Sequence, residues 1–315
     1  MALHNKTTTG KNAMEYIRHG ICENESDLTA IVKKAMSGTE DARLRQVLES
    51  LVEHAHRFVR EVDLTENEFE KGLEFLVGIG KATHEKKNEV VLAADVLGIS
   101  TLVALRNNPT RHGQTAAALL GPFYRGGAPE CELGANIARS DTPGRPLLVR
   151  GQVRDIHGRP IPGSLIDVWQ ASPVGLYENQ DPRQQNMNLR GKFRADDHGR
   201  FHFRSVRPAG YPVPTDGPVG ELLALQKRHP YRPAHLHFIV SALGHKTLVT
   251  QVFADDSEHL ESDVVFGAVR ALVGRFVAHH DRHPDLPGLA VPYYTLDYNF
   301  VLEEGVPSFP TPPIP

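Results

Sequence analysis

The sequence has little cysteine. Cys22 and Cys131 are the only two among 315 residues, which is too few for a disulfide framework. Two single cysteines far apart in the sequence also exclude a cluster of thiolate ligands. If the protein holds a metal ion, histidine nitrogens and carboxylate or phenolate oxygens must bind it. The 17 histidines are more than one site could use, so most of them have ordinary roles.

The sequence also lacks a long apolar run and a strong net charge. No stretch approaches the roughly 20 apolar residues that a membrane-spanning helix needs, and the opening MALHNKTTTG has no apolar core of a secretion signal. The formal net charge of −3 gives no general attraction to nucleic acids or anionic membranes. We therefore expect a cytoplasmic globular protein with neither nucleic acid nor membrane as a partner.

Helical periodicity is present from residue 26 to about residue 107. Between Leu44 and Val62 the apolar residues recur at steps of three and one, which predicts a helix of about five turns with one apolar stripe. Such a stripe needs a surface to pack on. It fits a dimerisation module, and it fits equally a helical subdomain that covers the sheet of its own chain.

Capping signals mark the ends of these helices. Thr39 is a candidate N-cap for the long helix, and Thr65 with Glu68 forms a capping box for the next one. A third helix is expected from about Val90 to Leu105. One exposed helix face is expected at Glu85, Lys86, Lys87 and Glu89.

Beyond about residue 118 the sequence becomes rich in glycine and proline, and short apolar runs alternate with turns, the pattern of a sandwich. The segment 264–280 fits helix or strand by periodicity, and its setting favours strand. We expect a mainly β fold with an α-helical N-terminal part, residues 1–118, and an antiparallel β-sandwich, residues 119–315. The expected strands lie in LLVRGQV, SLIDVWQAS, KFRADDHGRFHFRSV, AHLHFIVSA, KTLVTQVFA and YYTLDYNFVL.

Two histidines stand out in RPAHLHFIV, residues 232–240, which otherwise has the composition of a buried strand. Side chains in a strand alternate between faces, so His235 and His237 point the same way. Two imidazoles on one face can bind one metal ion. They can also serve a zinc hydrolase that holds a water molecule.

Two tyrosines in turns are candidates for completing such a site. Tyr177 lies in SPVGLYENQDP and Tyr211 in RPAGYPVPTDGPVG. A phenol has a pKa of about 10, which a trivalent cation lowers enough to make phenolate a strong donor. Two histidines with two tyrosinates suit ferric iron better than zinc. Taken alone, each tyrosine is more often a half-buried aromatic side chain in a turn than a metal ligand.

These motifs resemble a known family. GPFY, GQVRDIHGRPIPGSLIDVWQASPVGLY, GYPVPTDGPVG and RPAHLHF together are similar to the intradiol ring-cleaving dioxygenases, which include the catechol and hydroxyquinol 1,2-dioxygenases. The separation of Tyr211 from His235, with His237 two residues later, matches that family. The resemblance implies one non-haem Fe(III) per subunit, with water or hydroxide as a further ligand. The implied metal ligands are Tyr177, Tyr211, His235 and His237.

The resemblance also implies roles for three polar side chains. Tyr211 would be the ligand that substrate displaces, after which it helps take up a substrate proton. Arg232 would stabilise negative charge that develops on the substrate, and its alternative reading is a surface salt bridge. Gln251 occupies the position of a glutamine that hydrogen-bonds hydroxide or substrate, and its alternative is a polar residue on a solvated strand face.

The substrate is a small aromatic diol or triol together with O2, by the same resemblance. HPYRPAHLHF, TLVTQVF and LESDVVFGAV are closer to the hydroxyquinol branch, which implies cleavage of benzene-1,2,4-triol to 3-hydroxy-cis,cis-muconate and maleylacetate. FLVGIGKATHEKKNE, however, has no acidic residue just after FL to meet a third hydroxyl group, which keeps catechol and chlorinated or alkylated catechols as alternatives. The implied substrate contacts are Leu76, Leu120, Gly121 and Val265.

Two further expectations follow from the family. The sandwich would be the catalytic domain, and the N-terminal helices would form a homodimer interface that can enclose a lipid. A non-enzymatic alternative is a β-sandwich binding module with a helical dimerisation arm. The spacing of the two tyrosines and two histidines favours the enzyme.

Overall fold

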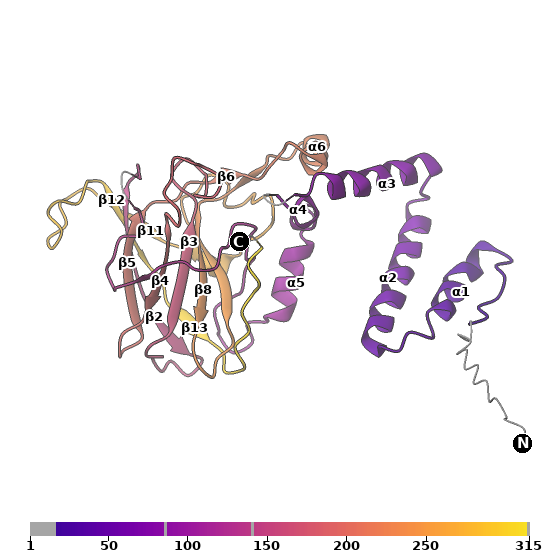
Figure 1. Cartoon of the computed structure of the whole chain (residues 1–315), viewed down its shortest axis with the longest axis horizontal. Helices are drawn as coiled ribbons and strands as arrows, with labels where there is room; N and C mark the ends of the chain where they lie inside the picture. Colours follow the sequence, from indigo (N-terminus) through magenta and orange to yellow (C-terminus); the bar gives the residue numbers. More distant parts are fainter. Residues whose placement is uncertain (1–16, 85–86, 140–141, 314–315) are drawn as a thin grey trace, which may run out of the picture. The chain divides into compact units, whose positions relative to one another are not determined.

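A computed structural model describes residues 17–84, 87–139 and 142–313. The chain divides into two compact units, Met1–Glu74 and Phe75–Pro315 (Figure 1). The helices are η1 (Glu25–Asp27), α1 (Leu28–Ala35), α2 (Ala42–Glu61), α3 (Glu66–Lys81), α4 (Glu89–Val96), α5 (Ile99–Asn107), α6 (Pro218–Leu225) and η2 (Arg270–Leu272). No helix among the described residues is both long and apolar enough to cross a membrane.

The first unit contains the long helix that the apolar stripe predicts. α2 begins after Asp41, whose carboxylate accepts hydrogen bonds from the backbone N–H groups of Arg43 and Leu44. The predicted N-cap Thr39 was therefore wrong by two residues, because an aspartate closer to the helix meets the free N–H groups. No residue of α2 is buried. Most of its apolar stripe is exposed in the single chain, at Leu44, Val47, Leu51, Phe58, Val59 and Val62.

The capping box of α3 is confirmed. The carboxylate of Glu68 accepts hydrogen bonds from the backbone N–H and the hydroxyl of Thr65, at 3.0 and 2.7 Å. The third predicted helix is two helices, α4 and α5, because the chain turns at Gly98, which has a φ of +72°. A left-handed backbone of this kind favours glycine.

The charged helix face expected before α4 was wrong where the structure describes it. Glu89 is fully buried, its carboxylate accepts a hydrogen bond from the backbone N–H of Val219 at 3.0 Å, and Lys87 Nζ lies 3.2 Å from its other oxygen. Glu89 therefore fastens the start of α6 to α4. Glu85 and Lys86 lie outside the described residues.

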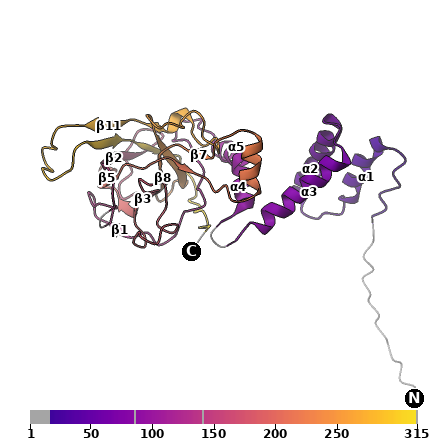
Figure 2. The same cartoon turned by 90° about the horizontal axis from the view of Figure 1, so that it is seen from above.

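The second unit is a sandwich of two sheets, with α4, α5 and α6 beside it (Figures 1 and 2). Among the described residues one sheet has the order β1-β4-β3-β8-β9-β10, the other has β11-β12-β2-β13 with β5 also paired to β2, and β6 and β7 form a two-stranded ribbon. The strands are β1 (Glu130–Cys131), β2 (Pro146–Asp155), β3 (Leu165–Gln170), β4 (Arg190–Arg194), β5 (Arg200–Val206), β6 (Tyr211–Pro212), β7 (Tyr231–Arg232), β8 (His235–Ser241), β9 (Leu248–Ala254), β10 (Val273–Gly274), β11 (Phe276–His279), β12 (Tyr293–Asp297) and β13 (Phe300–Leu302).

The predicted sandwich is confirmed, but its sheets are mixed rather than purely antiparallel. The pairs β1–β4, β9–β10, β2–β12 and β2–β13 are parallel, and the long central pairs β2–β5, β3–β8 and β8–β9 are antiparallel. Periodicity along one strand does not specify the direction of its neighbour, so the parallel pairs were not predicted. In the ambiguous segment 264–280 the structure has the short strands β10 and β11 after one turn of 3-10 helix.

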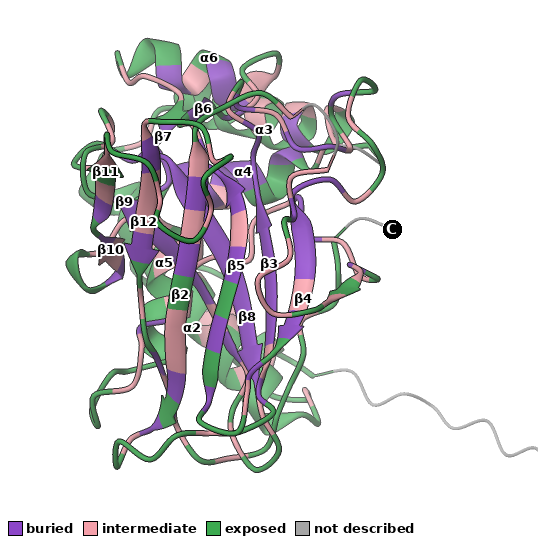
Figure 3. Cartoon of the chain, turned by 90° about the vertical axis from the view of Figure 1, so that its left-hand side faces the viewer, coloured by how far each residue is buried: buried purple, intermediate pink, exposed green. Residues whose placement is uncertain are grey.

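The core lies between the two sheets. It contains Phe193, Phe203 and Phe238, with ring centroids 5.0 Å apart for Phe193 and Phe203 and 6.5 Å apart for Phe203 and Phe238. Every residue of β8 is buried, so both faces of this strand are covered (Figure 3). The face of β8 that carries Phe238 packs into this core. His235 and His237 lie on the other face of the strand and point away from the core, because alternate residues face opposite ways.

Candidate active site

His235 and His237 project from the same face of β8, and their Nε2 atoms lie 3.1 Å apart. The ring of His235 is oriented by its Nδ1, which lies 2.7 Å from the backbone carbonyl oxygen of Pro233. If that Nδ1 carries the proton and donates it there, the lone pair of Nε2 is free and faces His237. Two ring nitrogens at this distance need a proton or a cation between them.

The two predicted tyrosines reach the same point from two different loops. Tyr177 follows β3, is 1% exposed, and places its hydroxyl oxygen 3.0 Å from Nε2 of His237. The hydroxyl oxygen of Tyr211, at the start of β6, lies 3.4 Å from that of Tyr177. The structure therefore brings all four predicted metal ligands into one buried cluster, although they are spread over 61 positions of the printed sequence.

Burial favours the neutral forms of His235, His237 and Tyr177 in the absence of a cation. It lowers the pKa of His235 to about 3 and that of His237 well below the usual value, with nearby Arg232 acting in the same direction. Burial and the neighbouring hydroxyl of Tyr211 raise the pKa of Tyr177 well above the usual value. Neutral imidazoles with lone pairs that converge on one point are the form in which histidine binds metals.

The donor set fits a metal ion. Metal–nitrogen and metal–oxygen bonds of about 2.1 Å place neighbouring donors about 3.0 to 3.4 Å apart, which agrees with the 3.0 to 3.4 Å separations between consecutive donor atoms here. No group of three or more histidine, cysteine, aspartate or glutamate side chains that could hold a metal occurs in the described part of the chain. The oxygen donors next to His235 and His237 are those of Tyr177 and Tyr211.

Aromatic rings and a glycine frame the cluster. The ring of Trp169, directly opposite His237 in the β3–β8 ladder, stacks on its imidazole at 4.7 Å and 10°. Phe123 stacks on Tyr177 at 4.6 Å. Gly121 has a φ of +76°, and a Cβ atom there would lie 3.0 Å from Cε1 of His237, so only glycine lets the loop approach the imidazole closely.

Arg232 is buried beside the cluster and is held by polar side chains. Its NH1 lies 3.3 Å from Nε2 of His235, and its NH2 donates to the side-chain oxygen of Gln251 at 2.9 Å. Gln251 is directly opposite His237 in the β8–β9 ladder and donates to the carbonyl oxygen of Leu119 at 2.7 Å. The alternative readings of Arg232 as a surface residue and Gln251 as a solvated one were wrong, since both side chains are buried.

Sequence reasoning missed Asp263, the ion-pair partner of Arg232. Its two carboxylate oxygens lie 3.1 Å from Nε and NH2 of the arginine. Burial alone would raise the pKa of Asp263, but Arg232 outweighs that effect and the pKa is lowered. Asp263 stands at the head of DVVFG, and an acidic residue just before a glycine-containing turn was the only available signal.

Two of the four predicted substrate contacts lie at the cluster, and a third lies in a neighbouring apolar group. Leu120 packs against the group that contains Tyr177 and Tyr211, and Gly121 lies so close to His237 that an added Cβ atom would be 3.0 Å from its ring. Val265 is buried with Leu119, and its backbone N–H donates to Asp263 at 3.3 Å. Leu76 differs, because it is 60% exposed, and the α3 side chains that pack with Val265 are those of Phe75 and Ile79. A small cavity of about 50 Å³ reaches Phe123 from α4 and is lined also by Leu92, Asp95 and Pro214.

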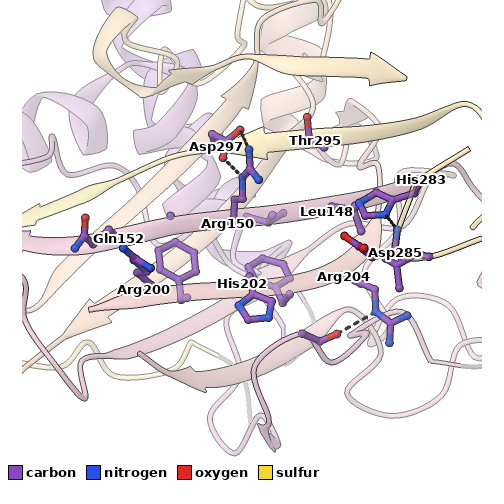
Figure 4. A pocket seen from close by; sticks show the side chains of 16 residues that line it. Leu148, Arg150, Gln152, Arg200, His202, Arg204, His283, Asp285, Thr295 and Asp297 are labelled. Carbon is purple, nitrogen blue, oxygen red and sulfur yellow. Dashed lines mark hydrogen bonds and ion pairs between the residues drawn. The ribbon is translucent and has the colours of Figure 1, made fainter. Parts of the chain in front are cut away.

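A larger cavity of about 750 Å³ lies on β2, β5 and β12, in the sheet opposite the one that carries His235 and His237 (Figure 4). Its charged side chains are mostly exposed, and Arg150 is neutralised by an ion pair with Asp297. Arg204 donates to the carbonyl oxygen of Gly134 at 3.0 Å. No residue of the histidine–tyrosine cluster lines this cavity, so the cavity is separate from the candidate active site.

The fold and this cluster define a family, and comparison with known proteins identifies it. The family described as Dioxygenase matches residues 119–304, and that described as Catechol dioxygenase N terminus matches residues 41–115. The chain belongs to the intradiol ring-cleaving dioxygenases. It is therefore an enzyme, as the sequence motifs predicted.

Particular relatives lie in the hydroxyquinol branch of that family. The chain is 40% identical to 6-chlorohydroxyquinol 1,2-dioxygenase of Cupriavidus pinatubonensis, over 89% of this chain and 97% of that one. It is 40% identical to hydroxyquinol 1,2-dioxygenase of a Rhizobium species, over 89% and 95%. The solved hydroxyquinol 1,2-dioxygenase of Pseudomonas putida superposes with a TM-score of 0.83, 39% identity and coverage of 89% and 99%. The solved catechol 1,2-dioxygenase of Pseudomonas arvilla superposes with a TM-score of 0.76 and 29% identity, over 89% of this chain and 92% of that one.

Proposed function

We propose that Tyr177, Tyr211, His235 and His237 hold one non-haem ferric ion. The observation that carries this proposal is that two imidazole nitrogens and two phenol oxygens converge. Nε2 of His235 lies 3.1 Å from Nε2 of His237, which lies 3.0 Å from the hydroxyl oxygen of Tyr177. That oxygen lies 3.4 Å from the hydroxyl oxygen of Tyr211. Two phenolates compensate much of the charge of Fe(III), which favours it over Zn(II). When bound, the ion acts as a Lewis acid that draws electron density from an aromatic diolate and fixes its orientation for attack by O2.

The residues around the ion have separate roles in this proposal. Tyr211 stands on a ribbon of two residues per strand. Its phenolate, which would hold the ion before substrate binds, could then move aside and accept a proton from a substrate hydroxyl, becoming a neutral phenol. Arg232 directs NH1 toward the cluster and stabilises negative charge that develops on the substrate. Gln251 accepts a hydrogen bond from NH2 of the guanidinium and lies opposite His237. From there it could hydrogen-bond a hydroxide or a substrate oxygen at the metal.

We propose hydroxyquinol, benzene-1,2,4-triol, as the substrate, with cleavage between adjacent hydroxylated carbons to give 3-hydroxy-cis,cis-muconate and its tautomer maleylacetate. Relatives at 40% identity that act on hydroxyquinols support this choice. Catechol or a chlorinated catechol is the second candidate, because similarity extends to a catechol 1,2-dioxygenase of Candida albicans at 36% identity. In either case we propose Leu120, Gly121 and Val265 as substrate contacts.

The experiment that tests the substrate is oxygen uptake with catechol, 4-chlorocatechol, protocatechuate and hydroxyquinol measured side by side. We expect the highest kcat/KM with hydroxyquinol. A clear preference for catechol would reject the hydroxyquinol assignment and retain the ring-cleaving dioxygenase. A fully metallated protein without colour would reject ferric iron, because ferric tyrosinate absorbs strongly in the visible range and zinc does not.

We also propose that the protein is a homodimer assembled through its N-terminal helices. The exposed stripe of α2 supports this, since a single chain leaves Leu51 62% and Phe58 55% exposed, and side chains of this size are usually covered. A bound lipid at that interface stays a prediction from the family resemblance. A cytoplasmic location likewise stays a prediction.

A further inference from the structure

The guanidinium of Arg232 is held on two of its three nitrogens. Asp263 accepts from Nε and NH2 at 3.1 Å each, and Gln251 accepts from NH2 at 2.9 Å. The remaining nitrogen, NH1, lies 3.3 Å from Nε2 of His235. A metal ion bound to His235 would use that lone pair, so the two N–H groups of NH1 would then be available to substrate.

The orientation of this guanidinium depends on the bidentate contact. Arginine side chains have several rotatable bonds, and a planar fork that meets a carboxylate through two parallel hydrogen bonds is fixed in direction. Gln251 alone offers one acceptor and leaves rotation about that single bond. Asp263 therefore determines which nitrogen of Arg232 faces the histidines.

The same carboxylate also holds the turn that follows it. The backbone N–H groups of Gly267 and Ala268 donate to one oxygen at 3.0 and 3.1 Å, and that of Val265 donates to the other at 3.3 Å. Val265 is a proposed substrate contact. One buried side chain thus connects the turn beside the substrate to the arginine.

Gly267 shows how closely this turn approaches the ion pair. A Cβ atom at this position would lie 2.9 Å from NH2 of Arg232 and 3.2 Å from Oδ2 of Asp263. Any side chain here must displace the guanidinium or the carboxylate. The turn is further fastened by the hydroxyl of Thr101, which donates to the carbonyl oxygen of Val265 at 3.0 Å.

We infer that Asp263 is a positioning residue for ring cleavage. It directs NH1 of Arg232 at the substrate and holds the backbone of the 263–268 turn beside that arginine. This inference rests on the proposed function. It assigns Asp263 no contact with substrate and no proton transfer. Its effect is exerted through Arg232, whose charge is needed when the substrate becomes most negative.

Steady-state kinetics of Asp263→Asn test the inference. We expect kcat to fall about 100-fold, the loss that misplacement by about 1 Å produces, while KM changes by less than about threefold. The matched control is Asp155→Asn. Asp155 is equally buried, pairs with Arg159 at 2.6 Å and accepts from the backbone N–H groups of His157 and Arg159, in a turn on the other sheet.

A double variant of Asp263 and Arg232 distinguishes a positioning role of Asp263 from a general loss of structure. If Asp263 acts through the arginine, the Arg232→Lys, Asp263→Asn double variant will be as slow as Arg232→Lys alone. Multiplicative losses, or a kcat of Asp263→Asn within threefold of the parent, would overturn the inference. Should Asp263→Asn fail to fold, Gly267→Ala provides the test, because it retains the carboxyl group of Asp263 but forces the guanidinium or the carboxylate out of its position. Unchanged kcat in that variant would also overturn the inference.

A measurement on the metal-free protein tests the inference without relying on enzyme activity. In 15N-arginine-labelled protein, the Nε–H signal of Arg232, assigned by its absence in Arg232→Lys, should exchange slowly with water and become fast-exchanging or lost in Asp263→Asn. Persistence of slow exchange in that variant would overturn the positioning role. If the parent protein cleaves no aromatic diol, the proposed function fails, and the exchange result still decides whether Asp263 orients the arginine.

Discussion

Tyr211 and Arg232 are directly opposite each other in the ladder between β6 and β7. The proposed proton acceptor, the phenolate of Tyr211, and the proposed charge-stabilising guanidinium of Arg232 are thus held by one short ribbon, while His235 and His237 are held by a long central strand. A ribbon of two residues per strand has few ladder hydrogen bonds, whereas Arg232 is held in addition by Asp263 and Gln251. Under the proposed function, we therefore expect the histidines to keep the metal while Tyr211 is the ligand that substrate displaces.

Replacing the two tyrosines one at a time should separate binding of the metal from displacement of a ligand by substrate. Tyr177→Phe removes a donor 3.0 Å from His237, and we expect loss of most bound iron and of the visible absorption. Tyr211→Phe should retain more iron, with a weaker absorption band, and lower kcat by about 100-fold or more, the range for a group that transfers protons. Metal analysis and absorption spectra of the purified variants measure this.

Tyr298→Phe is the control for these variants. Its hydroxyl donates to the carbonyl oxygen of Ala271 at 2.8 Å, and we expect parent-like iron content and activity. The strongest contradiction would come from a Tyr177→Phe, His235→Ala double variant that still cleaves aromatic rings. That result would place the metal elsewhere.

Removing the metal should reduce both activity and stability. Buried donors whose lone pairs converge repel one another without a cation, and a ligand present at 100 times its Kd stabilises the folded state by about 2.7 kcal/mol. We expect chelation to abolish oxygen uptake and to lower Tm by about 5 °C or more. Added iron should restore activity and Tm. Recovery of activity with zinc alone would reject the ferric centre.

Asp167 should make stability depend on pH in an unusual direction. Burial raises its pKa to about 6, although Lys192 and Tyr124 act in the opposite sense. The folded state therefore binds this proton more tightly than the unfolded state, whose carboxyl has a pKa of about 3.9. The contribution of Asp167 to folding is fully favourable below about pH 4 and is lost as the pH rises to 6 and above.

The Asp167→Asn variant measures that loss. Relative to the parent, its free energy of unfolding in urea should increase between pH 4 and pH 7.5 by an amount on the order of 2 kcal/mol. The exposed ion pair of Asp297 with Arg150 is the comparison, because replacing Asp297 by Asn should change stability by at most about 1 kcal/mol. A difference between Asp167→Asn and the parent that is the same at both pH values would contradict the effect.

Charge placed on α2 should weaken the proposed dimer. Leu51→Glu and Phe58→Glu put a carboxylate into the exposed stripe, and burying it between two chains would cost several kcal/mol. We expect the dimer Kd to rise at least about tenfold, as measured by sedimentation equilibrium. Leu243→Glu, at a leucine that is 96% exposed in the turn between β8 and β9, should leave the association unchanged. Equal behaviour of all three variants would mean that the stripe is not the interface.

Much of the site could be predicted because its residues have recognisable local settings. His235 and His237 follow from the alternation of a buried strand, and the two tyrosines from glycine- and proline-rich turns. Asp263 could not be predicted in the same way. Its role depends on a contact with Arg232 across 31 positions, and nothing in DVVFG indicates which cation it meets.

The fold shows the same limit. The capping box at Thr65 is a signal between near neighbours and was correct, whereas Glu89 was taken for an exposed residue because it stands in a charged stretch. Its partner, the backbone N–H of Val219, lies 130 positions further along the chain. Leu76 and Phe75 are adjacent in α3, and only packing with Val265 decides which of them faces inward.

The stacking of Trp169 on His237 gives this protein a built-in optical signal. Trp169 is the single tryptophan of the sequence, so the whole indole emission originates beside one proposed metal ligand. A paramagnetic, visibly absorbing ion bound to that imidazole quenches such emission, and loss of the ion restores it. Loading of the site, displacement of a ligand and the integrity of the central strand can therefore be followed in real time without any added dye.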